Sequence, residues 1–158
     1  MSLIFSRQCE YALQAVMYLA AQQPGEVVSI KELTKTLAIP YHFLGKILQN
    51  LTHTGILSSR KGHSGGFALA LPAENITLLQ IIEGIDGGAF MSSCLLGFEE
   101  CSSPNPCALH KQWSHSREAI VSMLKNKNIA EMAQQTKKAQ FRLHLPFEAS
   151  VEHSRSTH

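Results

Sequence analysis

The chain has 158 residues, of which 44% are hydrophobic and 16% are charged, and this size suits one compact core with an appendage. No apolar run approaches the length of a membrane span, and the first residues lack the order of a secretory signal, so we expect a cytoplasmic protein without a membrane partner. The net charge of +2 is uneven: residues 1–72 carry +3, residues 73–110 carry −5 and residues 111–158 carry +4. Nucleic acid is therefore a candidate partner for the basic front segment alone.

An amphipathic helix is predicted from about residue 6 to residue 21, because apolar residues recur there at a spacing of three to four and Pro24-Gly25 stops the pattern. Cys9 lies on the apolar face of this helix, and its simplest interpretation is a small buried hydrophobe. Glu10 lies one residue off that face. We therefore expect Cys9 inside the protein and Glu10 at the helix edge.

A helix-turn-helix is predicted between residues 29 and 53. Ser29 and Glu32 have the spacing of a capping box, and Ala38-Ile39-Pro40 forms a tight turn before a second helix over residues 40–53. The second helix directs its apolar residues inward: Phe43, Leu44, Ile47, Leu48 and Leu51. Its other face is rich in donors and carries no acid: Tyr41, His42, Gly45, Lys46, Gln49, Asn50 and His53. This face is typical of a helix that lies in a major groove, and we expect Tyr41, His42, Lys46 and Gln49 to contact DNA. Two ordinary core helices with a solvated face are the alternative.

A basic hairpin follows directly and favours the DNA-binding interpretation. Residues 56–61 and a segment with Phe67, Leu69 and Leu71 are predicted strands, joined by a glycine-rich turn over residues 62–66. Such a hairpin is a wing, and its glycines are expected to give left-handed freedom and let the backbone approach DNA. An enzyme's phosphate loop is disfavoured, because these glycines lie between strands and not before a helix. The wing residues expected to reach phosphates or a minor groove are Ser59, Arg60, Lys61 and His63.

Three of the four cysteines, Cys94, Cys101 and Cys107, lie in one loop, and His110 follows the last of them. Three thiolates and an imidazole form a plausible ligand set for an iron-sulfur cluster or zinc. Zinc fits less well, because its structural sites usually separate paired cysteines by about two to four residues, whereas six and five residues separate these cysteines. A disulfide is disfavoured in a reducing cytosol. Free thiols remain an alternative, and an iron-sulfur cluster is the favoured interpretation.

The remaining segments predict a closing helix over residues 77–85, a break at Gly87-Gly88, and a helix of about five turns beyond His110. That last helix carries an apolar stripe that no single partner in the chain obviously covers, so we expect a dimer through Trp113, Ile120, Val121 and Leu124. A short helix near residues 129–138 follows, and residues 139–158 are expected to be partly disordered. The sequence thus predicts a mainly α protein with a winged helix-turn-helix in residues 1–88, a cluster-binding loop in residues 89–110 and dimerisation helices in residues 111–138.

These motifs, in this order, resemble the winged-helix transcription regulators typified by the iron-sulfur cluster regulator IscR and the nitric-oxide-sensitive repressor NsrR. The resemblance runs from about Phe5 to Ala133 and rests on four features: the helix-turn-helix at residues 39–44, the wing at residues 60–67, the three-cysteine loop and the apolar dimer helix. The arrangement Cys107-x-x-His110-x-x-Trp113 is similar to that of IscR in particular.

The resemblance implies a homodimeric regulator, expected to be a repressor, that binds duplex DNA at a near-palindromic operator. It implies a two-iron cluster held by Cys94, Cys101, Cys107 and His110. Because the first cysteine gap is longer than in close relatives, a four-iron cluster stays open. NsrR-like members take an acidic ligand from the first helix of the partner subunit, and Glu10 near that position is the alternative fourth ligand.

The implied mechanism is linkage, in which the state of the cluster changes the placement of two reading heads and DNA affinity reports iron-sulfur, redox or nitric oxide status. A zinc-stabilised regulator and an iron-sulfur carrier or small redox protein are the competing functions. An enzyme is not expected, because the histidines are scattered and no serine or cysteine is framed by a base.

Overall fold

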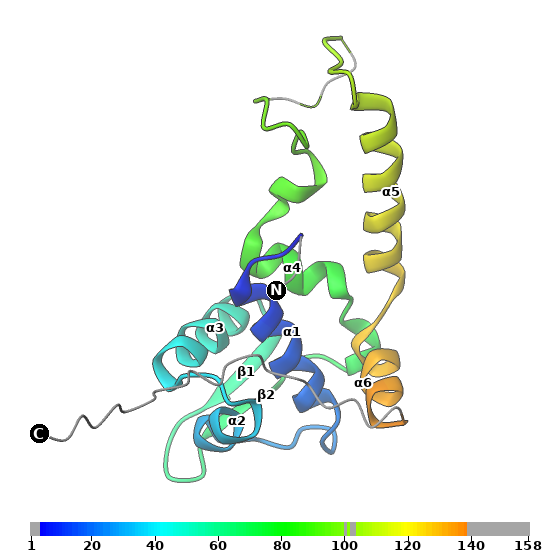
Figure 1. Cartoon of the computed structure of the whole chain (residues 1–158). Helices are drawn as coiled ribbons and strands as arrows, with labels where there is room; N and C mark the ends of the chain where they lie inside the picture. Colours follow the sequence, from blue (N-terminus) through cyan, green and yellow to red (C-terminus); the bar gives the residue numbers. More distant parts are fainter. Residues whose placement is uncertain (1–3, 100, 102–103, 139–158) are drawn as a thin grey trace, which may run out of the picture.

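The computed structural model describes residues 4–99, 101 and 104–138 (Figure 1). The predicted tail, residues 139–158, lies outside the described residues. As predicted, the fold is mainly helical with one small sheet. Its elements are α1 (Arg7–Ala20), α2 (Ile30–Leu37), α3 (Tyr41–His53), β1 (Leu57–Arg60), β2 (Gly66–Leu69), η1 (Ala73–Asn75), α4 (Leu78–Asp86), η2 (Gly88–Met91), α5 (His110–Asn126) and α6 (Ile129–Lys138). Among the described residues, no helix combines the length and apolar character needed to cross a bilayer.

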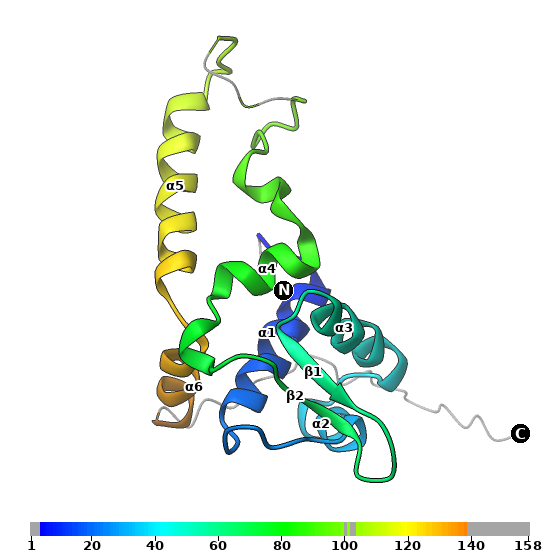
Figure 2. The same cartoon turned by 180° about the vertical axis from the view of Figure 1, so that it is seen from behind.

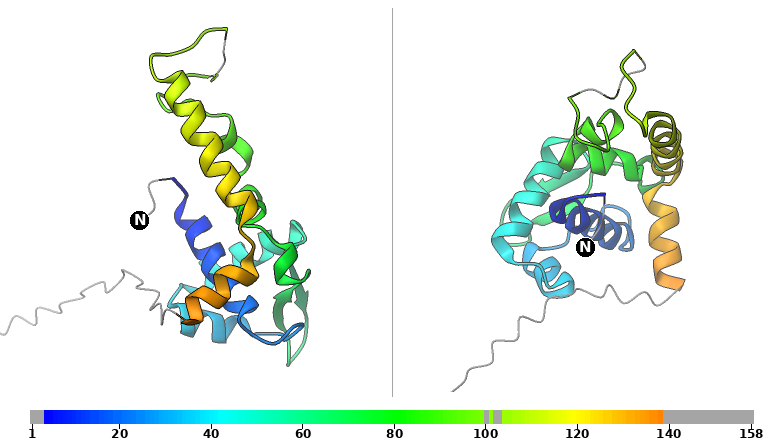
Figure 3. Two further views of the ribbon diagram at one scale, coloured as in Figure 1. Left: turned by 90° about the vertical axis from the view of Figure 1, so that its right-hand side faces the viewer. Right: turned by 45° about the horizontal axis from the view of Figure 1, so that its top comes forward.

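Helix α1 is the centre of the core, and it packs against α3, α4 and α6 (Figure 3). The predicted apolar stripe is its buried face: Cys9, Ala12, Ala15, Val16 and Leu19. Facing it are fully buried aliphatic side chains of α2, α3 and α4, among them Leu33, Leu44 and Ile81. Burial of these side chains removes apolar surface from water, which is the main term that holds the helices together.

The helix starts are fixed by side-chain caps. The Ser6 hydroxyl accepts from the Cys9 N–H (3.1 Å) and opens α1, and the Ser29 hydroxyl accepts from the Glu32 N–H (3.2 Å) and opens α2. The predicted capping box at Ser29 forms only in this half, because the Glu32 carboxylate accepts from the Tyr18 hydroxyl instead (3.0 Å). A complete capping box lies at the start of α4, where the Thr77 N–H donates to the Gln80 side chain at 2.8 Å.

The turn between α2 and α3 depends on Ala38, whose φ of 51° lies in the left-handed region. This conformation costs an L residue roughly 1–2 kcal/mol. It turns the chain sharply, so that Ile39 is buried and Pro40 precedes the first turn of α3. At the other end, Gly55 with φ 77° closes α3, and the Ile56 N–H donates back to the Leu51 carbonyl at 3.0 Å. The predicted helix-turn-helix is therefore present.

The wing is the antiparallel pair β1–β2, with Leu57 opposite Leu69 and Arg60 opposite Gly66. Ala68 is the buried residue of β2, whereas Leu71 lies beyond the strand and is 45% exposed.

The expected left-handed conformation is found at one glycine of the wing turn, and two others are needed for close packing of the backbone. Only Gly62 among them has a positive φ, at 105°. A Cβ on Gly65 would collide with the Arg60 carbonyl, and a Cβ on Gly66 would collide with the Val28 carbonyl. Val28 pairs with Phe67 through two backbone hydrogen bonds of 2.9 Å, so the segment before α2 lies directly against the wing.

Helix α5 extends away from the body, and the cysteine loop lies at its far end (Figures 1 and 2). The chain then returns to the body, since the Ile129 N–H donates to the Ile76 carbonyl at 2.9 Å and the Leu78 N–H to the Lys127 carbonyl at 3.0 Å. Helix α6 packs on α1 and η1 and buries Ile129 and Ala133. The apolar face of α6 is therefore covered by its own chain, while its predicted part in a dimer stays a prediction.

Candidate functional site

The α3 residues predicted to read DNA form one exposed surface. Tyr41, His42, Lys46 and Gln49 are all exposed, and the opposite face of α3 is buried in the core. Beside them runs a shallow groove of about 370 Å³, with Ile30 and Phe67 among its lining residues. The groove connects the outer face of α3 to the base of the wing. The reading helix and the wing are thus parts of one surface.

A second cavity, of about 640 Å³, lies between the wing turn and the start of α2. It brings Arg60, Lys61 and His63 together with Lys31, and no carboxylate is among its lining residues. A cavity lined by cationic side chains attracts phosphate. Sequence reasoning counted the charge of Lys31 without assigning it to the DNA surface. Lys31 lies at the start of the first helix of the helix-turn-helix, and this position could have indicated a phosphate contact from the sequence.

The wing and the cysteine loop lie at opposite ends of the molecule (Figure 2). The loop end holds a cavity of about 420 Å³ that is lined by all four predicted ligands, Cys94, Cys101, Cys107 and His110. We call this the cysteine pocket. The Cys101 sulfur lies 3.4 Å from His110 Nδ1. The His110 N–H donates to the Cys107 carbonyl at 3.0 Å, in the turn that leads into α5. The structure therefore brings together residues that are separated by up to 16 positions in the sequence.

The environment of Cys94 favours a thiolate. A backbone N–H from Leu96 lowers the pKa of the Cys94 thiol, and burial opposes this shift in part. Phe98 and Gly97 add further N–H donors, and the Cys107 side chain is also a hydrogen-bond partner. The thiolate is the form that binds metals. Cys94 thus has the electrostatic environment of a ligand.

Cys9 has the opposite environment. Burial raises the pKa of its thiol to about 12, with smaller contributions from the negative charges of Asp86 and Glu10. Its side chain is fully buried in the apolar cluster that includes Ile82 and Leu124. A thiol in this environment stays protonated and unreactive. Cys9 is therefore a core residue.

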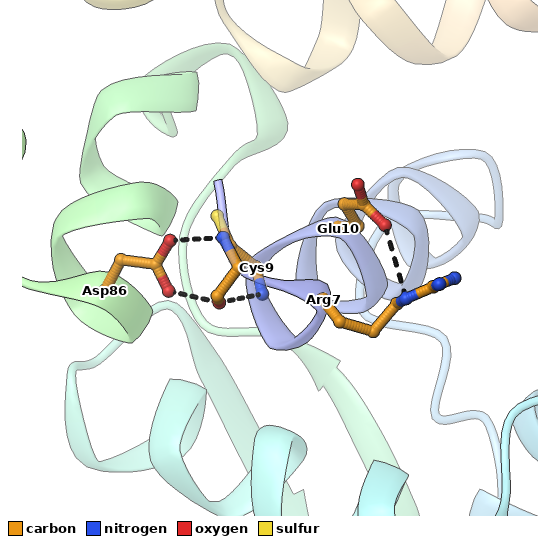
Figure 4. A network of polar contacts seen from close by, with 5 residues as sticks. Arg7, Cys9, Glu10 and Asp86 are labelled. Atoms are coloured by element: carbon orange, nitrogen blue, oxygen red, sulfur yellow. Dashed lines mark hydrogen bonds and ion pairs between the residues drawn. The ribbon is translucent and has the colours of Figure 1, made fainter. Parts of the chain in front are cut away.

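Glu10, the alternative fourth ligand, is not among the residues that line the cysteine pocket of its own chain. Its carboxylate lies 3.8 Å from Arg7 Nε, on the side of α1 turned away from Asp86 (Figure 4). Asp86 accepts from both the N–H and the hydroxyl of Ser6 and so ties the end of α4 to the start of α1. Within one chain, His110 is the residue that completes the set of four donors.

The donor chemistry of the cysteine pocket fits an iron-sulfur cluster. Three sulfurs and one imidazole nitrogen surround it, and Leu96 and Phe98 add an apolar wall. In the described part of the chain, no three His, Cys, Asp or Glu side chains are gathered closely enough for a single metal ion. A lone zinc ion needs four donors at about 2.0–2.3 Å from one point. The Cys101–His110 contact and the hydrogen bond between Cys94 and Cys107 bring the four donors together in two pairs.

The residues predicted to form the dimer stripe of α5 have different surroundings. Leu124 is only 4% exposed and packs with Cys9 and Ile82, so the expectation that no part of the chain covers the stripe is wrong at this end. Ile120 packs on the same cluster, and Val121 is half-buried. Trp113 contacts η2 through Phe90, with ring centroids 6.4 Å apart. Among the described residues of 87–126, the exposed large apolar side chains are Leu95, Leu96, Phe98, Leu109 and Met123.

Comparison with known proteins identifies the family. Residues 5–135 match the model of the Rrf2 family, described as iron-dependent transcriptional regulators. The chain belongs to the Rrf2 family. It is 35% identical over 132 residues to a protein of Aquifex aeolicus described as an HTH-type transcriptional regulator, covering 82% of this chain and 91% of that protein. A Mycobacterium tuberculosis protein with the same description is 33% identical over 129 residues, covering 81% of this chain and 80% of its own.

Solved Rrf2-like structures share the fold. CymR of B. subtilis, titled a global cysteine regulator, superposes with a TM-score of 0.74 at 24% identity and covers 85% of this chain and 99% of its own. IscR of T. potens superposes with a TM-score of 0.70 at 22% identity, covering 90% and 94%. The chain is therefore a DNA-binding transcriptional regulator of the Rrf2 family and not an enzyme.

Proposed function

We propose that this Rrf2 regulator is a homodimer whose DNA affinity is controlled by an iron-sulfur cluster in the cysteine pocket. The ligands are Cys94, Cys101, Cys107 and His110. The observation that carries the proposal is the convergence of these four side chains on one cavity, with Cys101 and His110 only 3.4 Å apart. One structural relative is named as a cysteine regulator and another as IscR, and the donor set favours a function like that of the second.

The proposal gives each segment one task. Residues 1–88 read a near-palindromic operator through α3, the wing and Lys31, while residues 89–110 hold the cluster. Helix α5 supplies the dimer contact, and the surface that a second copy would cover includes the exposed side chains of Leu109, directly before the helix, and Met123, in its last turn. Leu124, the neighbour of Met123, faces the body instead and is already covered.

The cluster would supply redox and nitric oxide reactivity at the pocket. The protein's own residues lower the pKa of the Cys94 thiol, place His110 one turn after Cys107, and line one wall of the pocket with Leu96 and Phe98. A two-iron cluster is favoured by the mixed sulfur and nitrogen donors, and a four-iron cluster is the alternative. A change in DNA affinity when the cluster is lost or modified follows from linkage, because a ligand shifts an equilibrium by its differential affinity for two states.

Anaerobic purification tests the proposal most directly. A brown protein with matched iron and sulfide and visible absorption that bleaches in air is the expected result. Iron content should fall to background in the Cys107→Ser variant. The variant should still bind duplex DNA at low salt, because its DNA-binding surface is unchanged. A colourless protein with stoichiometric zinc would support the zinc-stabilised regulator instead. A brown protein that binds no duplex DNA at low salt would support an iron-sulfur carrier.

A further inference from the structure

The Ser93 carbonyl, directly before Cys94, is held by two donors from α5. Trp113 Nε1 donates to it at 2.9 Å and Arg117 Nη1 donates at 3.0 Å. Trp113 and Arg117 are four residues apart on one helix, so their side chains lie on the same face, one turn apart. The carbonyl accepts one hydrogen bond with each of its two lone pairs.

The surrounding contacts make this attachment rigid. The Ser93 N–H donates to the Ala89 carbonyl at 2.8 Å, and its hydroxyl donates to the same oxygen, so the turn before Cys94 is closed on itself. The Trp113 ring meets Phe90 of η2 edge to face, and Phe90 meets Phe5 in the same way with centroids 5.8 Å apart. The polar and aromatic contacts therefore join α5, η2 and the start of α1.

The attachment matters because the pocket is assembled from two separate arms. Cys107 and His110 lie at the start of α5, whereas Cys94 arrives from η2 on the other arm. Little apolar burial holds the η2 arm, since Leu95, Leu96 and Phe98 are each more than half exposed. The distance between the arms is set where the Ser93 carbonyl meets α5.

We propose that Trp113 and Arg117 are positioning residues of the cysteine pocket, which fix Cys94 opposite Cys107 and His110 by holding the Ser93 carbonyl. This inference rests on the proposed function, because it assigns the two residues a role in metal binding at the same pocket. It is separate from the predicted dimer role of Trp113. Neither side chain ligates the metal. They set the geometry before binding, and so reduce the cost of bringing the two arms together.

Anaerobic titration of the metal-free, full-length protein with cobalt(II) tests the inference, read by sulfur-to-cobalt charge-transfer absorption. Trp113→Phe keeps an aromatic ring against Phe90 but removes the N–H donor, and Arg117→Met keeps the aliphatic stem but removes the guanidinium. Each variant should bind cobalt about 5- to 10-fold more weakly, the effect of one lost hydrogen bond. Arg117→Lys, which retains a donor, should recover part of the loss. Lys125→Met, exposed on the same helix, is the matched control and should bind like the parent.

Thiol labelling separates positioning from a general loss of structure. In the metal-free protein Cys94 is 8% exposed and Cys9 is fully buried. Iodoacetamide followed by peptide mass spectrometry should show faster labelling of Cys94 in Trp113→Phe and Arg117→Met, with Cys9 still protected. Faster labelling of both cysteines would mean that the variants merely unfold, and parent-like cobalt affinity in both variants would equally overturn the inference. A parent protein that gives no thiolate absorption with cobalt, and no visible absorption after anaerobic reconstitution with iron(II) and sulfide, contradicts the proposed function itself, and the positioning role with it.

Discussion

The body around α1 and the arm that carries the cysteine pocket are stabilised in different ways. The body has a contiguous core in which Leu33, Leu44, Leu48 and Ile81 are fully buried. Between Gly87 and Leu109, Cys94 is the only buried residue among those the structure describes. The body thus folds on its own hydrophobic burial, whereas the arm depends on hydrogen bonds, aromatic contacts and whatever the pocket binds. Under the proposed function, this difference lets the arm change while the DNA-binding surface keeps its shape.

Removing a leucine side chain should lower the free energy of unfolding strongly in the body and hardly at all in the arm. Leu48→Ala, at a fully buried position of α3, should lower the free energy of unfolding by about 2–5 kcal/mol through lost burial and a residual cavity. Leu96→Ala, at a position that is 51% exposed, should change it by no more than about 0.5 kcal/mol. Urea unfolding of the metal-free protein, followed by circular dichroism, measures both. Equal losses would contradict the division between body and arm.

The wing should be the most sensitive part of the body surface. Gly66→Ala places a Cβ against the Val28 carbonyl, and relief of this overlap should cost roughly 1–3 kcal/mol and loosen the wing from α2. The melting temperature and the affinity for the operator should both fall. Gly25→Ala is the contrasting variant, because it has a positive φ of 79° but open space around it. It should destabilise the protein through strain while it leaves operator affinity unchanged.

Variants of His110 and Glu10 test which of the two residues is the fourth ligand. His110→Ala should lower iron content and alter the visible spectrum, because it removes the donor that lies 3.4 Å from Cys101. His110→Cys should retain a cluster with a shifted spectrum. Glu10→Gln should leave iron content and spectrum as in the parent. Bleaching by Glu10→Gln with an intact spectrum in His110→Ala would instead identify a site completed by the partner subunit, with nitric oxide as the leading signal.

The smallest expected effects concern single contacts of the body with DNA. Lys31→Ala and Lys61→Ala should each weaken binding to all duplexes and reduce the slope of log affinity against log salt by about one, since each removes one phosphate contact. Lys125→Ala on α5 is the charge-matched control. Gln49→Ala should instead change the preference between sequences, because an amide reads a base edge. Fluorescence anisotropy with operator and scrambled duplexes across a salt series distinguishes the two outcomes.

The sequence determined the helices and the wing because their signals are local. Apolar residues at helical spacing placed α1 and α3, Pro24-Gly25 marked the end of the first pattern, and the glycine-rich segment marked a hairpin. The four candidate ligands could also be named from the sequence, because cysteines and a histidine in one loop are a recognisable set of metal donors.

Only the tertiary structure decided what covers each surface. Periodicity defines the apolar face of α5, but the packing of Leu124 against Cys9 and Ile82 depends on residues far away in the sequence. The same holds for Gly66, whose neighbour is the Val28 carbonyl, and for Lys31, which the fold brings to the wing. Local preference selects an element and the side of it that avoids water. Which partner fills that side is settled by long-range packing, and this is why the cysteine pocket and its attachment through Arg117 could not be derived from spacing alone.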